Sequence, residues 1–146
     1  MKIVIINGSP KGARGNTYFM AEAFSEGVRD AGAEAEIINL AGKNIRNCLG
    51  CYDCWIKTPG VCSIKDDMAE LLEKMKTADV LGYATPLYVD NVTGLMKNFM
   101  DRTIPVLDPH FNKDSGGECI HPGVWGKEPP KILVISNSGF PEIGHF

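Results

Sequence analysis

Short apolar runs alternate with longer amphipathic segments along this chain, a pattern typical of strands that alternate with helices. The strand-like runs are residues 2–6, 34–40, 78–84 and 131–136. The first of these is β-branched and has no polar alternation, as expected of a strand that is buried on both faces. Short strands separated by helices predict an α/β fold with a doubly wound parallel sheet.

Three segments between these strands repeat apolar residues at spacings of three and four, which predicts amphipathic helices. The first helix ends near Gly32, and its stripe is Phe19, Met20, Ala23, Phe24 and Val28. The second follows an N-cap signal at Ser63-Ile-Lys-Asp66, and its stripe is Met68, Leu71, Leu72 and Met75. The third starts at Thr93, and its expected inward stripe is Leu95, Met96, Phe99, Met100 and Thr103.

Three distinctive loops follow the first, third and fourth predicted strands, at residues 7–17, 85–92 and 136–142. The carboxyl ends of parallel strands meet at one edge of a sheet, and ligands bind there at the point where the strand order reverses. We therefore expect these loops to form one cofactor site.

The first loop offers the donors that a phosphate monoester requires. It matches neither G-x-x-x-x-G-K-[ST] nor G-x-G-x-x-G, so the P-loop and dinucleotide fingerprints are absent. At the start of the first helix it places hydroxyls, an amide and two cations, on Ser9, Thr17, Asn16, Lys11 and Arg14. Free N–H groups and the helix dipole favour an anion at that position. The alternative is a turn that only joins strand to helix.

The loop at residues 85–91 suits a flat heteroaromatic ring. Leu87 and Tyr88 supply a packing surface, and Pro86 fixes the turn. Asn91 either caps the next helix or meets the edge of the ring. A tyrosine in such a loop also serves ordinary packing, so this loop alone does not decide between the two.

Four of the five cysteines form a C-x2-C-x2-C-x7-C pattern, at Cys48, Cys51, Cys54 and Cys62. Dense thiolates select zinc, Cu(I) or an iron–sulfur cluster. The C-x2-C-x2-C run is typical of an iron–sulfur site, whereas zinc sites more often use two separated pairs or add histidine. Unligated or redox thiols are the remaining alternative. Cys119 is interpreted as an incidental thiol, and Tyr52 and Trp55 as packing around the cysteine loop.

The composition fits one domain over residues 1–146, with a cysteine-rich loop at 44–63. A net charge of −3 and the absence of a basic run argue against a nucleic-acid partner. No segment resembles a signal peptide or a membrane span, so we expect no membrane partner and a cytoplasmic location. There the cysteines would be reduced and available as ligands.

Taken together, these segments resemble the NADPH-dependent FMN reductase family of the flavodoxin-like superfamily, and within it the iron–sulfur flavoproteins. The matching pieces are residues 8–17, 48–62 continuing through 64–68, 86–97 with Phe99 and Asp101-Arg102, and Gly139-Phe-Pro-Glu142. They occur in the expected order and cover nearly the whole chain. Jointly they are specific, although singly only the cysteine segment is.

The resemblance implies FMN as cofactor, with its phosphate held by residues 9–17, including Gly15. It implies that the isoalloxazine is bordered by Pro86, Leu87, Tyr88 and Asn91, and that Ser138 and Gly139 complete the site. It further implies a [4Fe–4S] cluster on the four clustered cysteines, and a homodimer or homotetramer in which cluster and flavin approach across a subunit contact. Electrons would pass between cluster and FMN, with ferredoxin or a small molecule as donor or acceptor.

Two further functions stay open. One is an NAD(P)H-dependent FMN or quinone reductase without a cluster, and the other is a zinc-stabilised module that is not an enzyme. No acid–base side chain is assigned a catalytic role, because electron or hydride transfer is the flavin's own chemistry. Flavodoxin-like sheets have five strands and a final helix, whereas only four strands are predicted here. We interpret this as a truncated chain or as an edge that another subunit covers.

Overall fold

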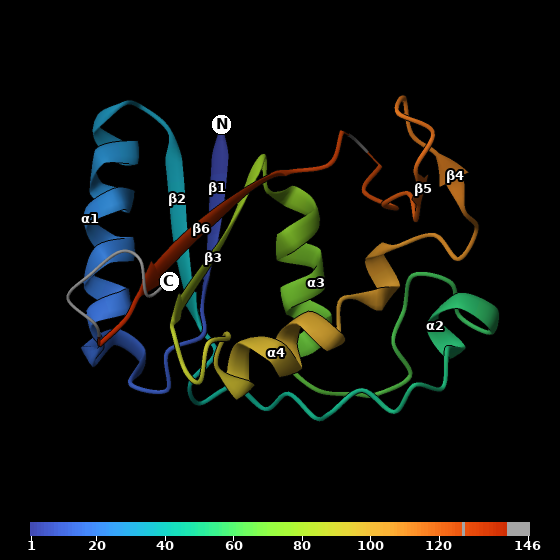
Figure 1. The fold of residues 1–146 in the computed structure, drawn as a ribbon, viewed down its shortest axis with the longest axis horizontal. Coiled ribbons are helices and arrows are strands. Elements are labelled where there is room, and N and C mark those ends of the chain that lie inside the picture. Colours follow the sequence, from blue (N-terminus) through green and yellow to red (C-terminus); the bar gives the residue numbers. More distant parts are fainter. Residues whose placement is uncertain (127, 140–146) are drawn as a thin grey trace.

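The protein is built on a parallel sheet, as predicted, and the structure gives its strand order as β2-β1-β3-β6 (Figure 1). The computed structural model describes residues 1–126 and 128–139. The strands are β1 (Lys2–Asn7), β2 (Glu34–Asn39), β3 (Val80–Pro86) and β6 (Lys131–Asn137). Ile5 pairs with Ile37 on one side and with Gly82 on the other, which places β1 inside the sheet. Strand β6 pairs with β3 alone among the described residues, so it forms an edge.

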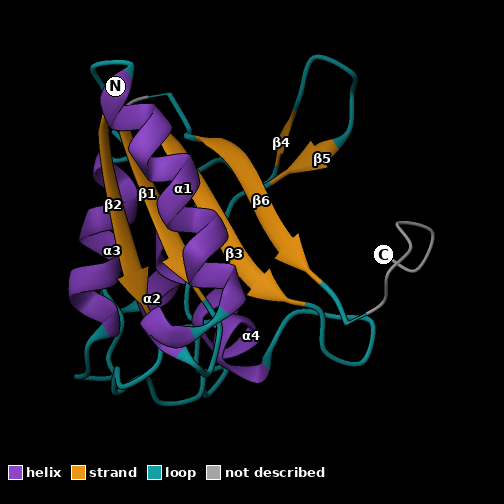
Figure 2. Ribbon diagram, turned by 90° about the vertical axis from the view of Figure 1, so that its left-hand side faces the viewer, coloured by secondary structure: helices purple, strands orange, loops and turns teal. Residues whose placement is uncertain are grey.

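Helices cover both faces of this sheet (Figure 2). Helix α1 (Asn16–Asp30) lies on one face, and α3 (Met68–Thr77) and α4 (Gly94–Asp101) lie on the other. The short helix α2 (Asp53–Ile56) lies away from the sheet, in the cysteine-rich loop (Figure 1). Because side chains alternate along a strand, Ile5 packs towards Ala21 of α1, and Ile6 packs towards α3 and α4 on the other face. Over the described residues, no helix is long and apolar enough to cross a membrane.

Most of the predicted apolar stripe of α1 faces away from the sheet, although Val28 packs, partly buried, against the core. Phe19 is 62% exposed and Met20 is 43% exposed. The buried positions are instead Thr17, Ala21 and Ser25, whose small side chains let the helix lie close against the strands. The two stripes share the helical period, so spacing alone could not show which of them faces inward.

The other two predicted helices are confirmed, but the start of α3 and the extent of the buried face of α4 differ from the prediction. In α3, the four predicted apolar residues are all buried, but the N-cap is Asp67 rather than Ser63. The carboxylate of Asp66, the last residue of the predicted cap signal, pairs instead with Arg102. In α4, Met96 and Phe99 face the core while the flanking apolar residues are partly exposed.

Short elements make up the connections. A 3₁₀ turn, η1 (Gly12–Arg14), precedes α1, and a second, η2 (Ile104–Val106), follows α4. The connection between η2 and β6 contains an antiparallel pair, β4 (Asn112–Lys113) and β5 (Cys119–Ile120). The hairpin is exposed and was not predicted, since each of its strands has only two residues.

Candidate functional site

Side-chain hydrogen bonds join the three loops that were predicted to meet at the edge of the sheet. The Thr17 hydroxyl donates to Asn137 Oδ1 at 2.6 Å, which joins the start of α1 to the end of β6. The Thr93 hydroxyl donates to the Gly8 carbonyl at 2.6 Å, which joins the N-terminus of α4 to the end of β1. The predicted meeting of these loops is therefore observed through residue 139, whereas residues 140–142 lie outside the described part of the chain.

The loop between β1 and α1 is fixed from within by buried polar groups. The Asn7 side chain accepts a hydrogen bond from the Ser9 N–H at 3.0 Å, and the Ser9 hydroxyl accepts one from the Lys11 N–H at 3.3 Å. A Cβ atom on Gly15 would lie 2.7 Å from Ser9 Oγ, so the loop closes around a position that only glycine fits. Buried Asn7 thus shapes the predicted phosphate loop, although it was not a predicted site residue.

The predicted donors of this loop divide into buried and exposed groups. Ser9 and Thr17 are 3% and 1% exposed, whereas Lys11, Arg14 and Asn16 lie at the surface. Helix α1 begins at Asn16, so its first N–H groups have no acceptor within the helix. Such a helix start, with two cations beside it, is suited to an anion.

The loop after β3 closes in a tight turn between Tyr88 and Asn91, each of which donates its N–H to the carbonyl of the other. Pro86 is buried, Leu87 is partly buried, and Tyr88 is 48% exposed. The N-cap of α4 is Thr93, whose hydroxyl accepts the Met96 N–H. The Asn91 side chain accepts the N–H of Val92 and therefore does not cap the helix.

The loop after β6 reaches the same edge of the sheet. The Asn137 carbonyl accepts the Leu87 N–H at 2.8 Å, so this loop lies beside the loop after β3. Ser138 is partly buried and Gly139 is exposed. The predicted ring-binding residues therefore lie in adjacent loops.

Val89 sits at the tip of the Tyr88–Asn91 turn with φ 50°, and it is 98% exposed. A β-branched residue in this region is strained by about 1–3 kcal/mol, and asparagine tolerates it better. We expect Val89→Asn to raise the free energy of unfolding by about 1 kcal/mol, measured by urea denaturation. Val92→Asn, at a partly buried position next to the turn, is the control and should not stabilise the protein. Equal or lower stability of Val89→Asn would contradict the strain.

The four predicted metal ligands, Cys48, Cys51, Cys54 and Cys62, all line one cavity. Cys54 lies on α2 and is buried, Cys62 is partly buried, and the other two are exposed. None of these thiols forms a disulfide with another described cysteine. Within residues 1–126 and 128–139, no three His, Cys, Asp or Glu side chains are already arranged to hold a metal ion. The structure thus brings the cysteines to one place without placing their sulfurs in ligand geometry.

The environment of Cys54 disfavours its thiolate. Burial raises the pKa of the Cys54 thiol, and the nearby thiol of Cys62 raises it further. Cys51 and Cys48 raise the pKa of Cys54 in the same direction but by less. A cationic metal centre favours the thiolate form of the cysteines that ligate it, so metal binding by cysteine releases protons.

Next to Cys54 on α2, the Trp55 indole N–H donates to the carbonyl of Leu107 at 2.8 Å and to that of Ile104 at 3.2 Å. Its ring lies 5.3 Å from the ring of Tyr52. The packing role predicted for these two aromatic residues is therefore observed, with Trp55 joining the cysteine loop to η2.

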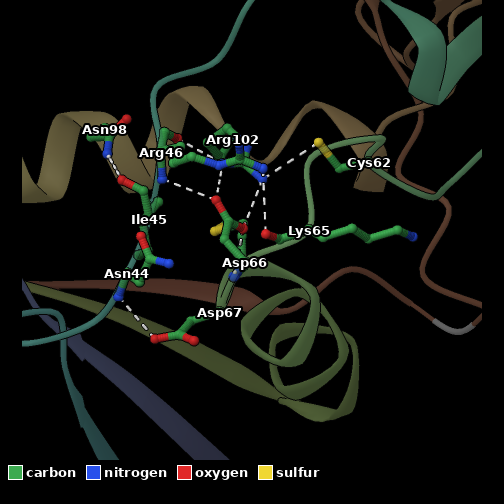
Figure 3. Close-up of polar contacts among 10 residues, drawn as sticks. Asn44, Ile45, Arg46, Cys62, Lys65, Asp66, Asp67, Asn98 and Arg102 are labelled. Atoms are coloured by element: carbon green, nitrogen blue, oxygen red, sulfur yellow. Dashed lines mark hydrogen bonds and ion pairs between the residues drawn. The ribbon is translucent and has the colours of Figure 1, made fainter.

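A buried ion pair, Arg102 with Asp66, lies beside the cavity and was missed as a site feature (Figure 3). Burial alone would raise the pKa of the Asp66 carboxyl. Hydrogen bonds from Arg102 and from the N–H groups of Arg46 and Met68 outweigh burial and hold that pKa below its ordinary value. Asp101-Arg102 is one of the pieces that match the family, but helical spacing alone does not distinguish Arg102 from a surface residue.

Comparison with known proteins identifies relatives of this architecture. The family model described as NADPH-dependent FMN reductase matches residues 1–116. An iron–sulfur flavoprotein of Archaeoglobus fulgidus is 47% identical over 103 residues, which are 70% of this chain and 49% of that protein. An iron–sulfur flavoprotein of Methanocaldococcus jannaschii is 39% identical over 106 residues, 73% of this chain and 53% of that protein. The chain thus spans about half the length of these curated relatives.

Solved structures show the same fold at low identity. An NAD(P)H:quinone oxidoreductase from Methanothermobacter marburgensis is 20% identical with a TM-score of 0.70, covering 97% of this chain and 67% of that one. An FMN-dependent NADH-azoreductase from Bacillus anthracis, solved with FMN, is 21% identical with a TM-score of 0.65. This match covers 95% of this chain and 70% of that one. The flavodoxin-like α/β fold is confirmed. The match over residues 1–116 places this chain, as the resemblance predicted, in the NADPH-dependent FMN reductase family.

Proposed function

We propose that this chain is an FMN-dependent oxidoreductase that passes electrons between FMN and a [4Fe–4S] cluster held by Cys48, Cys51, Cys54 and Cys62. The observation that carries the proposal is the cavity that all four cysteines line. Thiolates in this number are the ligands of such clusters. Relatives named iron–sulfur flavoproteins support the same assignment.

The FMN part of the proposal rests on the loops at the edge of the sheet. The loop at residues 9–17 suits a phosphate, because it brings hydroxyls and two cations to the start of α1, and Gly15 lets the backbone lie close against Ser9. Its proposed ligands are Ser9, Lys11, Arg14, Gly15, Asn16 and Thr17. The ring would lie against Pro86, Leu87, Tyr88 and Asn91, with Ser138 and Gly139 beside it. When bound, FMN supplies the hydride or electron transfer, and the protein orients and shields it.

Helix α4 connects the two parts of the site. Its N-cap, Thr93, is bonded to the first loop through the Gly8 carbonyl, and its C-cap, Arg102, lines the cysteine cavity. Eight residues at 1.5 Å rise span about 12 Å, so the ends of one short helix contact the two predicted cofactor sites. Figure 1 shows α4 between the start of α1 and α2.

One observation favours a second candidate, an NAD(P)H-dependent FMN or quinone reductase whose cysteines carry no metal. Within the described residues, the four thiols are not arranged as a ligand set. In that case NAD(P)H would be the electron donor and the FMN site would act alone.

The test is the composition of protein purified without oxygen. We expect flavin absorption bands together with a broad iron–sulfur shoulder, and about four iron and four sulfide per chain. Flavin with no iron or sulfide would overturn the cluster and favour the second candidate. Stoichiometric zinc without flavin would overturn both and indicate a zinc-stabilised module.

A substitution in the first loop tests the FMN site separately. We expect Gly15→Ala to weaken FMN binding about 3- to 10-fold, because its Cβ would displace the Ser9 hydroxyl and remove a hydrogen bond of about 0.5–1.5 kcal/mol. The measurement is fluorescence titration of the apoprotein with FMN. Gly27→Ala, in α1 with no atom near the added Cβ, is the matched control and should bind normally. Unchanged affinity in Gly15→Ala would remove this loop from the site.

Partners and location complete the proposal. Phe19 of α1 and Val134 of β6 are 62% and 65% exposed, and such apolar surface suits contact between subunits of a homodimer or homotetramer. A cytoplasmic location would keep the cysteines reduced, with a ferredoxin-like protein or a small molecule as the electron partner. Light scattering of the purified chain tests the assembly, and a monomer at micromolar concentration would exclude it.

A further inference from the structure

Arg102 is the largest fully buried side chain among the described residues, although it carries a charge. Its guanidinium contacts three residues, Arg46, Cys62 and Asp66 (Figure 3). Nη1 donates to the Arg46 carbonyl at 2.6 Å and to Asp66 Oδ2 at 2.7 Å. Nη2 donates to Asp66 Oδ1 at 3.0 Å and to Cys62 Sγ at 3.4 Å. One side chain therefore holds both the segment that leads to Cys48 and the segment that contains Cys62.

The pair with Asp66 fixes the direction of this contact. Two parallel hydrogen bonds between a guanidinium and a carboxylate hold both groups in one plane. The Asp66 side chain is itself held by the N–H groups of Arg46 and Met68. The donor that reaches Cys62 therefore belongs to a rigid network, in contrast to a mobile surface arginine.

The network leaves one donor without a partner. Arg102 Nε is the buried side-chain nitrogen or oxygen that has no hydrogen-bond acceptor among the described residues. A buried donor that has lost its water and gained no acceptor is unfavourable. Because Arg102 also lines the cavity, a negatively charged group bound there would lie beside an incompletely satisfied cation.

We propose that Arg102 is a positioning residue for the cysteine site, one that orients Cys62 towards the cavity and makes a bound cluster easier to reduce. The inference rests on the proposed function, since it assigns a role towards the cluster. A cationic N–H donor to a ligating sulfur stabilises the more negative, reduced state, and hydrogen bonds to the sulfurs are among the features that set a cluster's potential.

The experiment is a redox titration of the cluster, followed by its visible and electron paramagnetic resonance signals, in the wild type and in Arg102→Lys. Lysine keeps the charge for Asp66, but it lacks the fork that serves Asp66 and Cys62 together. We expect iron and sulfide content to be retained, while the ratio of reduced to oxidised cluster at a fixed potential falls about tenfold. For one electron this corresponds to a shift of about 59 mV to lower potential.

Two other variants make the result decisive. Lys97→Gln removes an exposed cation of the same helix and should leave the potential unchanged. If Arg102→Lys does not fold, the double variant Asp66→Asn/Arg102→Gln leaves no lone buried charge and should show the same fall. Loaded protein whose potential is unchanged would overturn the role of Arg102 alone. Wild-type protein without iron would overturn the proposed cluster, and this inference with it.

Discussion

Replacing Asp66 with alanine is expected to lower the free energy of unfolding by about 3–5 kcal/mol, because it leaves the Arg102 guanidinium buried without its counter-ion. The two side chains are 0% and 1% exposed, so water cannot replace the lost partner. The change also removes acceptors for the N–H groups of Arg46 and Met68. Urea denaturation at neutral pH measures the loss.

Asp101→Asn is the matched control for this substitution. Asp101 precedes Arg102 and pairs with Lys97, but both of these side chains are about half exposed. Exposed ion pairs contribute about 0–1 kcal/mol, so the control should stay within that range. A loss in Asp66→Ala no larger than in Asp101→Asn would show that the buried pair does not stabilise the fold.

The same pair predicts a dependence on pH. The folded-state pKa of Asp66 lies below its ordinary value, so the unfolded chain takes up a proton at higher pH than the folded one does. The stability that Asp66 contributes is therefore complete above its unfolded pKa of about 3.9, and it is lost as the pH falls through the folded pKa. The difference between wild type and Asp66→Ala should shrink as denaturation is repeated from pH 5 downwards. A constant difference would contradict the lowered pKa.

The sequence predicted the strands, their parallel arrangement and the meeting of three loops, because buried strands have a continuous apolar pattern and parallel topology fixes where their ends lie. It could not predict which side of α1 is buried, since the small residues Thr17, Ala21 and Ser25 repeat as regularly as the large apolar ones. Local spacing describes a helix, whereas contact with the sheet selects its inner face.

Local sequence patterns are an even poorer guide to the polar residues of the site than to the buried face of α1. Asn137 and Arg102 act through partners that are far away in the sequence, such as the bond from Thr17 to Asn137 across 120 positions. A motif can indicate donors that are neighbours in the chain, as for the first loop and the cysteines. It contains no information about a side chain that reaches the site from another element.

Cys54→Ala is expected to abolish the iron and sulfide content of protein purified without oxygen. Cys54 is the buried member of the four cysteines and lies on α2, so the backbone cannot readily bring another sulfur into its place. Alanine is preferred to serine, because a serine hydroxyl would add an oxygen that could itself bind iron. Cys119→Ala is the matched control, since that thiol is exposed in the β4–β5 hairpin and does not line the cavity.

The measurement is iron and acid-labile sulfide per chain, read together with the flavin absorption of the same samples. The proposed FMN loops contain no cysteine, so flavin should remain in both variants and serves as an internal control for folding. Cluster content that is undiminished in Cys54→Ala would show that this sulfur is not a ligand. Equal loss in both variants would indicate general damage, because Cys54 lines the cavity and Cys119 does not. Loss confined to Cys54→Ala, with flavin retained, would separate the cysteine site from the flavin site within one chain.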